Sequence, residues 1–249
     1  MEKTTFGLIG FPLGHSFSRT FFMDKFAREG IDAEYLNFEI PRIEDFTSII
    51  RNHPNLKGLN VTLPYKQIVI PFLDELSEEA RAIGAVNVIR ISQTEKGICL
   101  KGFNSDTIGF TNSIRPLLQP HHHTALVLGT GGASKAICHS LNTLGIKWKY
   151  VSRTPRNGAY TYEELTPEII RNFPVIVNCT PVGMHPKTDV CPPIPYKGIS
   201  AAHLVYDVVY NPETTLFMEK AQAQGATTKN GLEMLHQQAI AAWDFWHSR

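Results

Sequence analysis

A short glycine-rich turn follows an apolar segment near the middle of the chain. Ala125 to Leu128 have the pattern of a buried strand, and Gly129, Gly131 and Gly132 follow at once, before a helical pattern. Such a turn lets the backbone approach a pyrophosphate, which then lies against the N-terminal amides of the next helix. The match is G-x-G-G-A and not the full G-x-G-x-x-G, so an ordinary strand-to-helix turn is the alternative. We predict a nucleotide site here.

The end of the next predicted strand indicates which nucleotide would bind. Ser152, Arg153 and Thr154 stand about twenty residues past the glycines, where an aspartate or glutamate would bind the ribose hydroxyl of NAD. A carboxylate would repel a 2'-phosphate, whereas a guanidinium pairs with it in a contact of roughly 1.5 to 3 kcal/mol. That energy corresponds to about a ten- to hundredfold preference for NADP over NAD. The sequence therefore predicts NADP as the cofactor.

Polar residues also end a predicted strand in the first part of the chain. Asn60, Thr62 and Lys66 belong to the run Asn-Val-Thr-Leu-Pro-Tyr-Lys. Ligands of open α/β sheets collect beyond the carboxyl ends of strands, so these side chains could form a polar pocket. For Lys66 alone, a solvated position on the first turn of a helix is the simpler interpretation. Asp106 opens a later helical pattern, where an aspartate is first of all an N-cap candidate.

Composition excludes several classes of protein. The net charge is +1, with 24 basic and 23 acidic residues, which gives no long-range field to attract nucleic acid or an anionic membrane. The four cysteines form no C-x-x-C pair, so neither a zinc knuckle nor a disulfide framework is indicated. We interpret the run from His121 to His123 as a solvated linker, and we expect no metal. With no leader and no apolar run of about 18 residues, we expect a soluble cytoplasmic protein with a small-molecule ligand.

Apolar periodicity predicts alternating strands and helices. The length of 249 residues is near the size, about 250 to 300 residues, at which a single core stops growing, so we expect two domains. The repeated strand–helix–strand order predicts an α/β fold, with a mainly parallel sheet in the N-terminal part. The predicted strands are 5–10, 33–40, 59–63, 88–91, 98–100, 125–128, 148–152, 175–179 and 204–209. The first predicted helix begins near Ser16 or Ser18, and the other predicted helices are 42–52, 77–83, 107–118, 132–144, 213–224 and 231–247.

Eight motifs in a fixed order resemble the shikimate dehydrogenase family over nearly the whole chain. Residues 60–66 match its Asn-Val-Thr-x-Pro-x-Lys motif without a departure. The other motifs are the serine motif at 10–18, Gly84–Asn87, Gly102–Asp106, the cofactor loop Gly129–Ala133, Ser152–Thr154, Tyr210 in Tyr-Asn-Pro-x-x-Thr, and Gln238 in the helix after Gly231. Four residues differ from the usual ones: Arg19 replaces proline, Val88 and Ser105 replace threonine, and Ser152 replaces asparagine.

The resemblance implies two lobes, each with a role. Residues 1–105 would form the substrate-binding and catalytic domain, joined by the C-terminal helix 231–249, and residues 106–230 a Rossmann-like NADP-binding domain. The implied activity is the reversible, NADP-dependent reduction of 3-dehydroshikimate to shikimate, a step toward the aromatic amino acids.

The resemblance also assigns roles to single residues. Lys66 and Asp106 would be the catalytic pair. Substrate would contact Ser16, Ser18, Asn60, Thr62, Lys66, Asn87, Asp106, Tyr210 and Gln238. NADP would contact Gly129, Thr130, Gly131, Gly132, Ala133, Ser152, Arg153, Thr154 and Gly231.

Other functions fit parts of the same pattern. A relative acting on quinate or an aminated analogue, with NAD as an alternative cofactor, would share these motifs. A non-catalytic NADP-binding regulator would keep the glycine turn but lose the chemistry, and the intact Lys66 and Asp106 argue against it. A methyltransferase would use the turn for S-adenosylmethionine, and Arg153 argues against that. We expect the protein to be a monomer or a homodimer.

Overall fold

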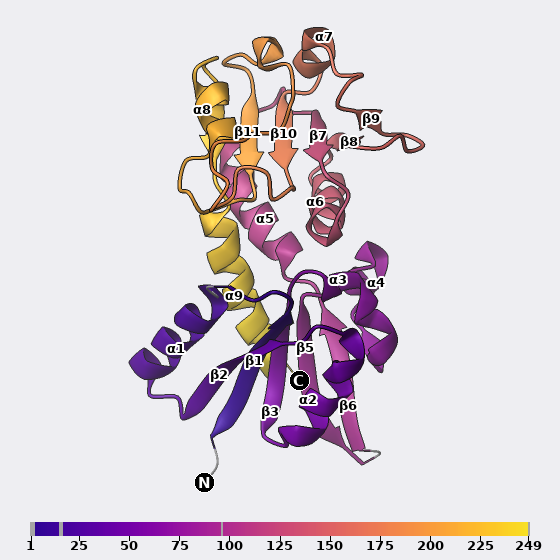
Figure 1. Ribbon diagram of the computed structural model, residues 1–249, viewed down its shortest axis with the longest axis vertical. Helices are drawn as coiled ribbons and strands as arrows, with labels where there is room; N and C mark the ends of the chain where they lie inside the picture. Colours follow the sequence, from indigo (N-terminus) through magenta and orange to yellow (C-terminus); the bar gives the residue numbers. More distant parts are fainter. Residues whose placement is uncertain (1–2, 15–16, 96, 249) are drawn as a thin grey trace. The chain divides into compact units, whose positions relative to one another are not determined.

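The computed structural model describes residues 3–14, 17–95 and 97–248. The chain divides into two compact units, one made of residues 1–105 and 239–249 and the other of residues 106–238. Each unit contains a six-stranded sheet with helices packed against it (Figure 1). The predicted α/β fold class with two mainly parallel sheets is therefore confirmed.

The sheet of the first unit has the order β2-β1-β3-β5-β6-β4. Its strands are β1 (Thr4–Gly10), β2 (Ala33–Glu39), β3 (Leu56–Val61), β4 (Glu75–Leu76), β5 (Val88–Thr94) and β6 (Gly97–Phe103). Strands β1, β2 and β3 run parallel, and β4 is parallel to β6, whereas β5 is antiparallel to both of its neighbours. The three parallel strands therefore bring their carboxyl ends to one edge.

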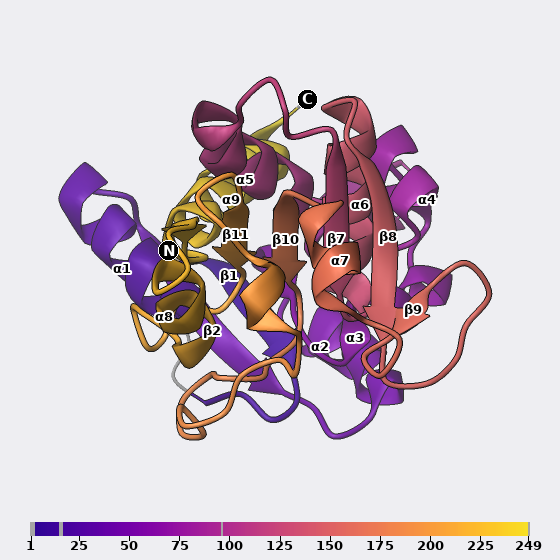
Figure 2. The ribbon, with the colours of Figure 1, turned by 90° about the horizontal axis from the view of Figure 1, so that it is seen from above.

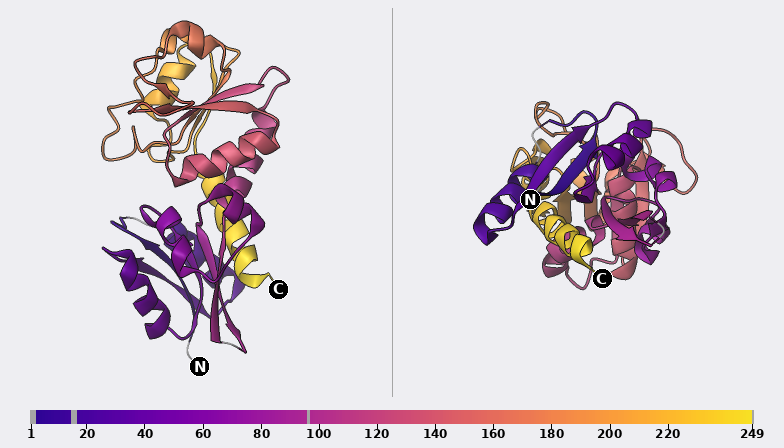
Figure 3. Two further views of the ribbon diagram at one scale, coloured as in Figure 1. Left: turned by 90° about the vertical axis from the view of Figure 1, so that its right-hand side faces the viewer. Right: turned by 90° about the horizontal axis from the view of Figure 1, so that it is seen from below.

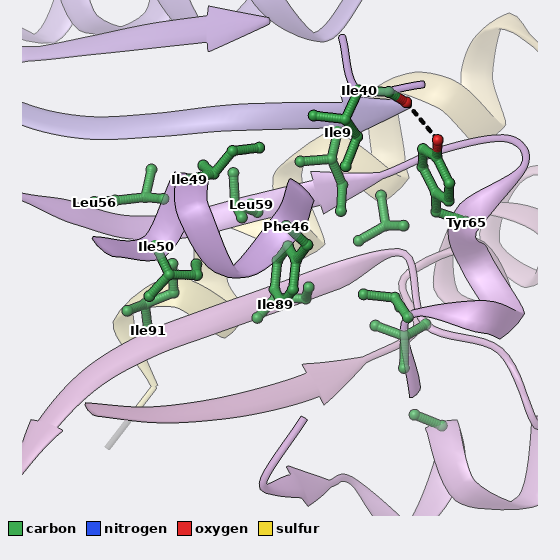
Figure 4. Packing of buried hydrophobic residues seen from close by; sticks show 14 residues of the cluster. Ile9, Ile40, Phe46, Ile49, Ile50, Leu56, Leu59, Tyr65, Ile89 and Ile91 are labelled. Atoms are coloured by element: carbon green, nitrogen blue, oxygen red, sulfur yellow. Dashed lines mark hydrogen bonds between the residues drawn. The ribbon is translucent and has the colours of Figure 1, made fainter. Parts of the chain in front are cut away.

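Both faces of this sheet are covered by apolar side chains. On one face, Ile9, Leu59 and Ile89 pack against Phe46 of α2 (Phe46–Asn52) (Figure 4). The same face of the sheet is covered by α3 (Tyr65–Ile68), α4 (Glu78–Ile83) and the short 3-10 helices η1 (Ile43–Asp45) and η2 (Ile70–Phe72). The Tyr65 hydroxyl donates a hydrogen bond to the Ile40 carbonyl and so closes this core at one end.

The opposite face packs against α1 (Phe17–Glu29) and the last part of α9 (Leu232–His247). Phe22 and Trp246 are buried there, and the Trp246 indole lies directly over Gly58, where an added Cβ would come within 2.4 Å of the ring. A tryptophan of the last helix therefore packs in this core, where Trp246 stacks on Phe6 at 4.7 Å.

The sheet of the second unit is entirely parallel and has the order β12-β11-β10-β7-β8-β9 (Figure 2). Its strands are β7 (Thr124–Leu128), β8 (Lys147–Ser152), β9 (Tyr160–Thr161), β10 (Val175–Asn178), β11 (Leu204–Asp207) and β12 (Thr227–Lys229). The chain leaves β7 in one direction for β8 and then returns to the other side for β10. The carboxyl ends of β7 and β10 therefore form the switch point at which doubly wound sheets bind ligands.

Helices cover both sides of this second sheet (Figure 3). Residues of α5 (Asp106–Ile114) and α6 (Gly132–Thr143) pack on one face. On the other face lie α7 (Pro167–Arg171), α8 (Leu216–Gln222) and the 3-10 helix η4 (Tyr196–Gly198). A further 3-10 helix, η3 (Arg115–Leu117), follows α5 directly.

Several element boundaries differ from the sequence prediction, and contacts in the structure explain two of them. Strand β3 begins at Leu56, three residues before the predicted start, because Leu56 already pairs with β1. Helix α8 begins at Leu216 and not at residue 213, because the Thr215 side chain caps it by accepting a hydrogen bond from the Met218 N–H at 3.4 Å. In both places, contacts between distant or capping residues decide where the element starts.

The three adjacent histidines are not all solvated, contrary to the interpretation of the sequence. His122 is buried, its Nδ1 accepts a hydrogen bond from the Gln119 N–H at 2.9 Å, and burial lowers its pKa. His121 and His123 are exposed. Within residues 3–14, 17–95 and 97–248, no three histidine, cysteine or acidic side chains gather as metal ligands, and no helix has the length and apolar character needed to cross a membrane.

Candidate active site

Asn87 is the centre of a buried polar cluster in the first unit. Its side-chain oxygen accepts a hydrogen bond from the Ser105 N–H at 2.7 Å, and its Nδ2 donates to the Ser105 Oγ at 3.1 Å. The Asn87 backbone carbonyl accepts from the Val61 N–H at 2.9 Å. Both Asn87 and Ser105 are less than 5 % exposed. These bonds fix the position of the residue that directly precedes Asp106 in the chain.

Asn60 lies close to this cluster, at the carboxyl end of β3. Its Nδ2 points to the Asn87 carbonyl at 3.4 Å, and its Oδ1 accepts a hydrogen bond from the Tyr35 hydroxyl at 2.8 Å. The Tyr35 hydroxyl is also hydrogen-bonded to the Ser18 side chain near the start of α1. Burial raises the pKa of Tyr35, and this hydrogen bond with Ser18 acts against that rise. Three residues from separate elements thus share one chain of hydrogen bonds.

Thr62 and Lys66 follow Asn60 in the turn after β3. The Thr62 N–H donates to the Ile9 carbonyl at 2.9 Å, and the Thr62 carbonyl accepts from the Tyr65 N–H at 2.9 Å, which ends the strand and starts α3. Lys66 lies half-buried in α3, and its backbone carbonyl accepts from the Val86 N–H at 2.7 Å. The turn is therefore tied to the segment that leads into Asn87. Ser16 lies outside the described residues.

Asp106 and Gln238 lie on two helices of the second unit that touch closely. Asp106 is the first residue of α5 and is 2 % exposed. Three residues later on the same helix, an added Cβ at Gly109 would lie 2.5 Å from the Met234 carbonyl oxygen and 3.3 Å from the Gln238 Cβ. Residues three apart share a helix face, so the glycine contact brings the Asp106 face of α5 against the Gln238 turn of α9.

The glycine turn after β7 is held tightly on one side and open on the other. Gly129 has a φ of +99°, and a Cβ there would lie 2.9 Å from the Thr180 Cγ2, so the position requires glycine. An added Cβ at Gly131 would meet nothing within 4 Å. Gly131 caps α6, which begins at Gly132, and the flanking Thr130 and Ala133 are half-buried. The turn can therefore offer its helix amides to an anion.

Ser152, Arg153 and Thr154 follow the neighbouring strand β8 at the same edge of the sheet. The Gly129 N–H donates to the Val151 carbonyl at 2.9 Å, which holds the two strand ends side by side. The Ser152 hydroxyl is buried and accepts a hydrogen bond from the Thr154 N–H at 3.3 Å, whereas the Arg153 and Thr154 side chains are exposed. An exposed cation therefore stands beside the glycine turn.

A second buried network shapes the loops after β10 and β11. The Asp207 carboxylate accepts hydrogen bonds from the Asn178 amide at 3.0 Å, the Thr215 hydroxyl at 2.6 Å and the Val209 N–H at 3.0 Å. Burial raises the pKa of Asp207 to about 6, and these three hydrogen bonds act against that rise. The same network fixes the loop that carries Tyr210, whose pKa burial raises. Gly231 lies against this loop, since an added Cβ would come within 2.0 Å of the Val208 carbonyl oxygen.

Comparison with known proteins identifies the family. The model of the shikimate dehydrogenase substrate binding domain matches residues 8–89. A protein of Methanosphaera stadtmanae named shikimate dehydrogenase (NADP(+)) is 36% identical over 259 residues, which is 96% of this chain and 90% of that protein. The chain belongs to the shikimate dehydrogenase family.

Solved structures of the shikimate dehydrogenase family agree with the fold. The enzyme of Aquifex aeolicus superposes with a TM-score of 0.86 at 33% identity, over 99% of this chain and 93% of that one. The enzyme of Thermus thermophilus, solved in complex with NADP(H) and shikimate, gives a TM-score of 0.84 at 30% identity, over 98% and 94% of the two chains. The similarity extends over both units of the chain.

The structure brings many of the predicted site residues together within each unit. In the first unit, hydrogen bonds connect Ser18, Asn60 and Asn87, and Thr62 and Lys66 adjoin them in the chain. In the second unit, Gly109 of the helix that Asp106 begins packs against the turn of α9 that carries Gln238, and the glycine turn lies beside residues 152–154. Sequence reasoning missed Tyr35, although a tyrosine in an otherwise apolar strand such as β2 is a signal for a buried hydroxyl with a partner.

Proposed function

We propose that this protein catalyses the reversible, NADP-dependent reduction of 3-dehydroshikimate to shikimate, a step toward the aromatic amino acids. The observation that carries the proposal is similarity over 96% of the chain to proteins named shikimate dehydrogenase (NADP(+)). The polar cluster around Asn60 and Asn87 supports it, because a site built from buried hydrogen-bonding groups suits a substrate with several hydroxyls.

The residues at the edge of the second sheet fit NADP as the cofactor. The open space above Gly131 leaves room for a pyrophosphate over the amides of α6. The exposed guanidinium of Arg153 would pair with the 2'-phosphate, and no carboxylate stands among residues 152–156 to repel it. The other proposed cofactor contacts are Gly129, Thr130, Gly132, Ala133, Ser152, Thr154 and Gly231.

Lys66 and Asp106 are the proposed catalytic pair. NADPH, when bound, supplies the hydride that reduces the C3 carbonyl of the substrate ring. Lys66 and Asp106 together would supply the proton that the C3 oxygen takes up. In the oxidation direction the pair takes that proton back. Ser16, Ser18, Asn60, Thr62, Asn87, Tyr210 and Gln238 would hold the carboxylate and hydroxyls of the ring.

These residue roles give each part of the chain a proposed function. Residues 1–105 with the C-terminal helix 231–249 are the proposed substrate-binding and catalytic domain, and residues 106–230 the NADP-binding domain. We further propose a cytoplasmic enzyme that works as a monomer or homodimer and needs no metal, nucleic acid or membrane.

An absorbance assay tests the function directly. Purified protein is mixed with shikimate and NADP, and formation of reduced nicotinamide is followed. Parallel reactions replace shikimate by quinate, or NADP by NAD. We expect the fastest turnover at low substrate concentration with shikimate and NADP. If shikimate is turned over with neither NADP nor NAD, the proposed function is refuted. Faster turnover of quinate than of shikimate would reassign the substrate.

A further inference from the structure

Tyr35 connects two of the proposed substrate contacts although it is too deeply buried to reach a ligand. Its side chain is 1 % exposed, and its ring stacks on Phe22 of α1 at 5.0 Å with an interplanar angle of 11°. Phe26 and Trp246 complete the apolar surroundings. A hydroxyl in such a place costs stability unless it is hydrogen-bonded, so its partners decide what the residue does.

The topology of the sheet explains why a tyrosine stands here. Strand β1 lies between β2 and β3, so the Tyr35 side chain must cross β1 to reach Asn60. Tyr35 pairs with Phe6, and Asn60 pairs with Leu8, two residues further along β1 on the same face. Two strand spacings amount to about 9.6 Å, a span that a long side chain with a terminal hydroxyl can bridge.

The bond to Asn60 selects which end of the amide faces the site. The Asn60 Oδ1 accepts the Tyr35 proton at 2.8 Å, and one hydrogen of Nδ2 points to the Asn87 carbonyl at 3.4 Å. The second Nδ2 hydrogen has no partner among the described residues. Asn60 is therefore held with an N–H directed toward the strand end. The reverse orientation of the amide would place its Oδ1 against the Asn87 carbonyl oxygen and leave the Tyr35 hydroxyl proton without an acceptor.

We propose that Tyr35 is a positioning residue that holds the Asn60 amide so that its N–H is presented to an oxygen of the substrate. The role rests on the proposed function. Without the Tyr35 hydroxyl, only the longer hydrogen bond to the Asn87 carbonyl at 3.4 Å orients the amide, so a substrate oxygen meets its oxygen end for part of the time. The Ser18 hydroxyl also loses the partner that links it to this group.

The substitution Tyr35→Phe tests the proposal because it removes only the hydroxyl. We expect the KM for shikimate to rise about tenfold, in the range for loss of one buried hydrogen bond, with kcat changed less than about twofold and the KM for NADP unchanged. The matched control is Tyr206→Phe. Tyr206 is equally buried and its hydroxyl bonds to the Ser113 Oγ at 2.7 Å, so this control should lower the thermal midpoint without changing the KM for shikimate.

A double-mutant cycle shows whether Tyr35 acts through Asn60. If it does, Y35F combined with Asn60→Ala has the same KM for shikimate as Asn60→Ala alone. Additive effects, or an unchanged KM in Y35F when the native enzyme turns over shikimate, overturn the role of Tyr35 and leave the function intact. Failure of the native protein to turn over shikimate overturns both.

Discussion

The two proposed binding regions hold their polar groups in different ways. In the first unit, the Asn60 and Asn87 side chains are bonded to buried partners, Tyr35 and Ser105. In the second unit, the glycine turn offers backbone amides, and Arg153 extends from the end of β8 into solvent. One region depends on a fixed network of side chains, and the other depends on backbone shape and an exposed charge.

This difference suits the two ligands. A small ring with several hydroxyls is recognised by donors and acceptors in fixed directions, because a buried group left without its partner costs about 1 to 3 kcal/mol. A dinucleotide spreads its contacts over a long molecule, so close backbone approach and one charge pair are sufficient to select it. Substitutions should therefore affect turnover and substrate binding in the first region, and cofactor binding in the second.

The largest expected effect belongs to Lys66, which tests whether the chemistry lies in the first region. We expect Lys66→Ala to lower kcat by about a hundred- to ten-thousandfold, the range for a positioned proton-transfer group. The matched control is Lys57→Ala, because Lys57 is an exposed lysine on β3 of the same unit. Initial rates of nicotinamide absorbance change measure both variants. Near-normal turnover by Lys66→Ala would remove it from the catalytic pair.

A pair of glycine substitutions separates stability from cofactor binding in the second region. Gly129→Ala forces a side chain into a left-handed backbone and against Thr180, so we expect a loss of about 1 to 3 kcal/mol in the free energy of unfolding. Gly131→Ala has an ordinary φ of −80° and open space around it, so its stability should stay close to native.

Cofactor titration completes that comparison. The new methyl group of Gly131→Ala would stand where the pyrophosphate approaches, and we expect the KM for NADP to rise about tenfold while the KM for shikimate stays constant. Thermal melting and steady-state kinetics on the two variants measure the separation. A Gly131→Ala variant with native KM for NADP would show that the pyrophosphate does not pass over this residue.

How far the sequence could predict these regions depends on the distance between partners. The Asn60 to Lys66 run and the glycine turn are local, because one strand end or one turn holds the whole motif, and both could be found in the sequence as candidate sites. The hydrogen bonds between Asn87 and Ser105 join residues 18 positions apart, and the bond from Tyr35 to Asn60 joins residues 25 positions apart and crosses a strand. Such pairs follow from strand order and register, which no local pattern contains.

The close contact at Gly109 gives the same lesson for helices. The sequence predicts both α5 and α9, but the reason for a glycine at 109 appears only when the Met234 carbonyl lies where its side chain would be. The start of β3 at Leu56 likewise depends on pairing with β1, a strand far away in the sequence. Local chemistry was therefore predictable, whereas its supports depend on tertiary packing.

Substitution of Arg153 tests whether the second region selects its ligand by charge alone. Arg153 is exposed, and the neighbouring Ser152 hydroxyl is occupied by the Thr154 N–H at 3.3 Å, so the guanidinium carries most of the expected preference for the 2'-phosphate. We expect Arg153→Ala to reduce the ratio of kcat/KM for NADP over NAD by about ten- to a hundredfold, the equivalent of one charge-assisted contact. Thermal stability should stay native, because an exposed side chain without a structural role is removed.

Arg171→Ala, which removes an exposed arginine on α7 of the same unit, is the control and should keep the native ratio. If Arg153→Ala kept its preference for NADP, selection would have to come from a fixed group such as the Ser152–Thr154 turn, and the contrast between a side-chain network in one region and an exposed charge in the other would no longer hold.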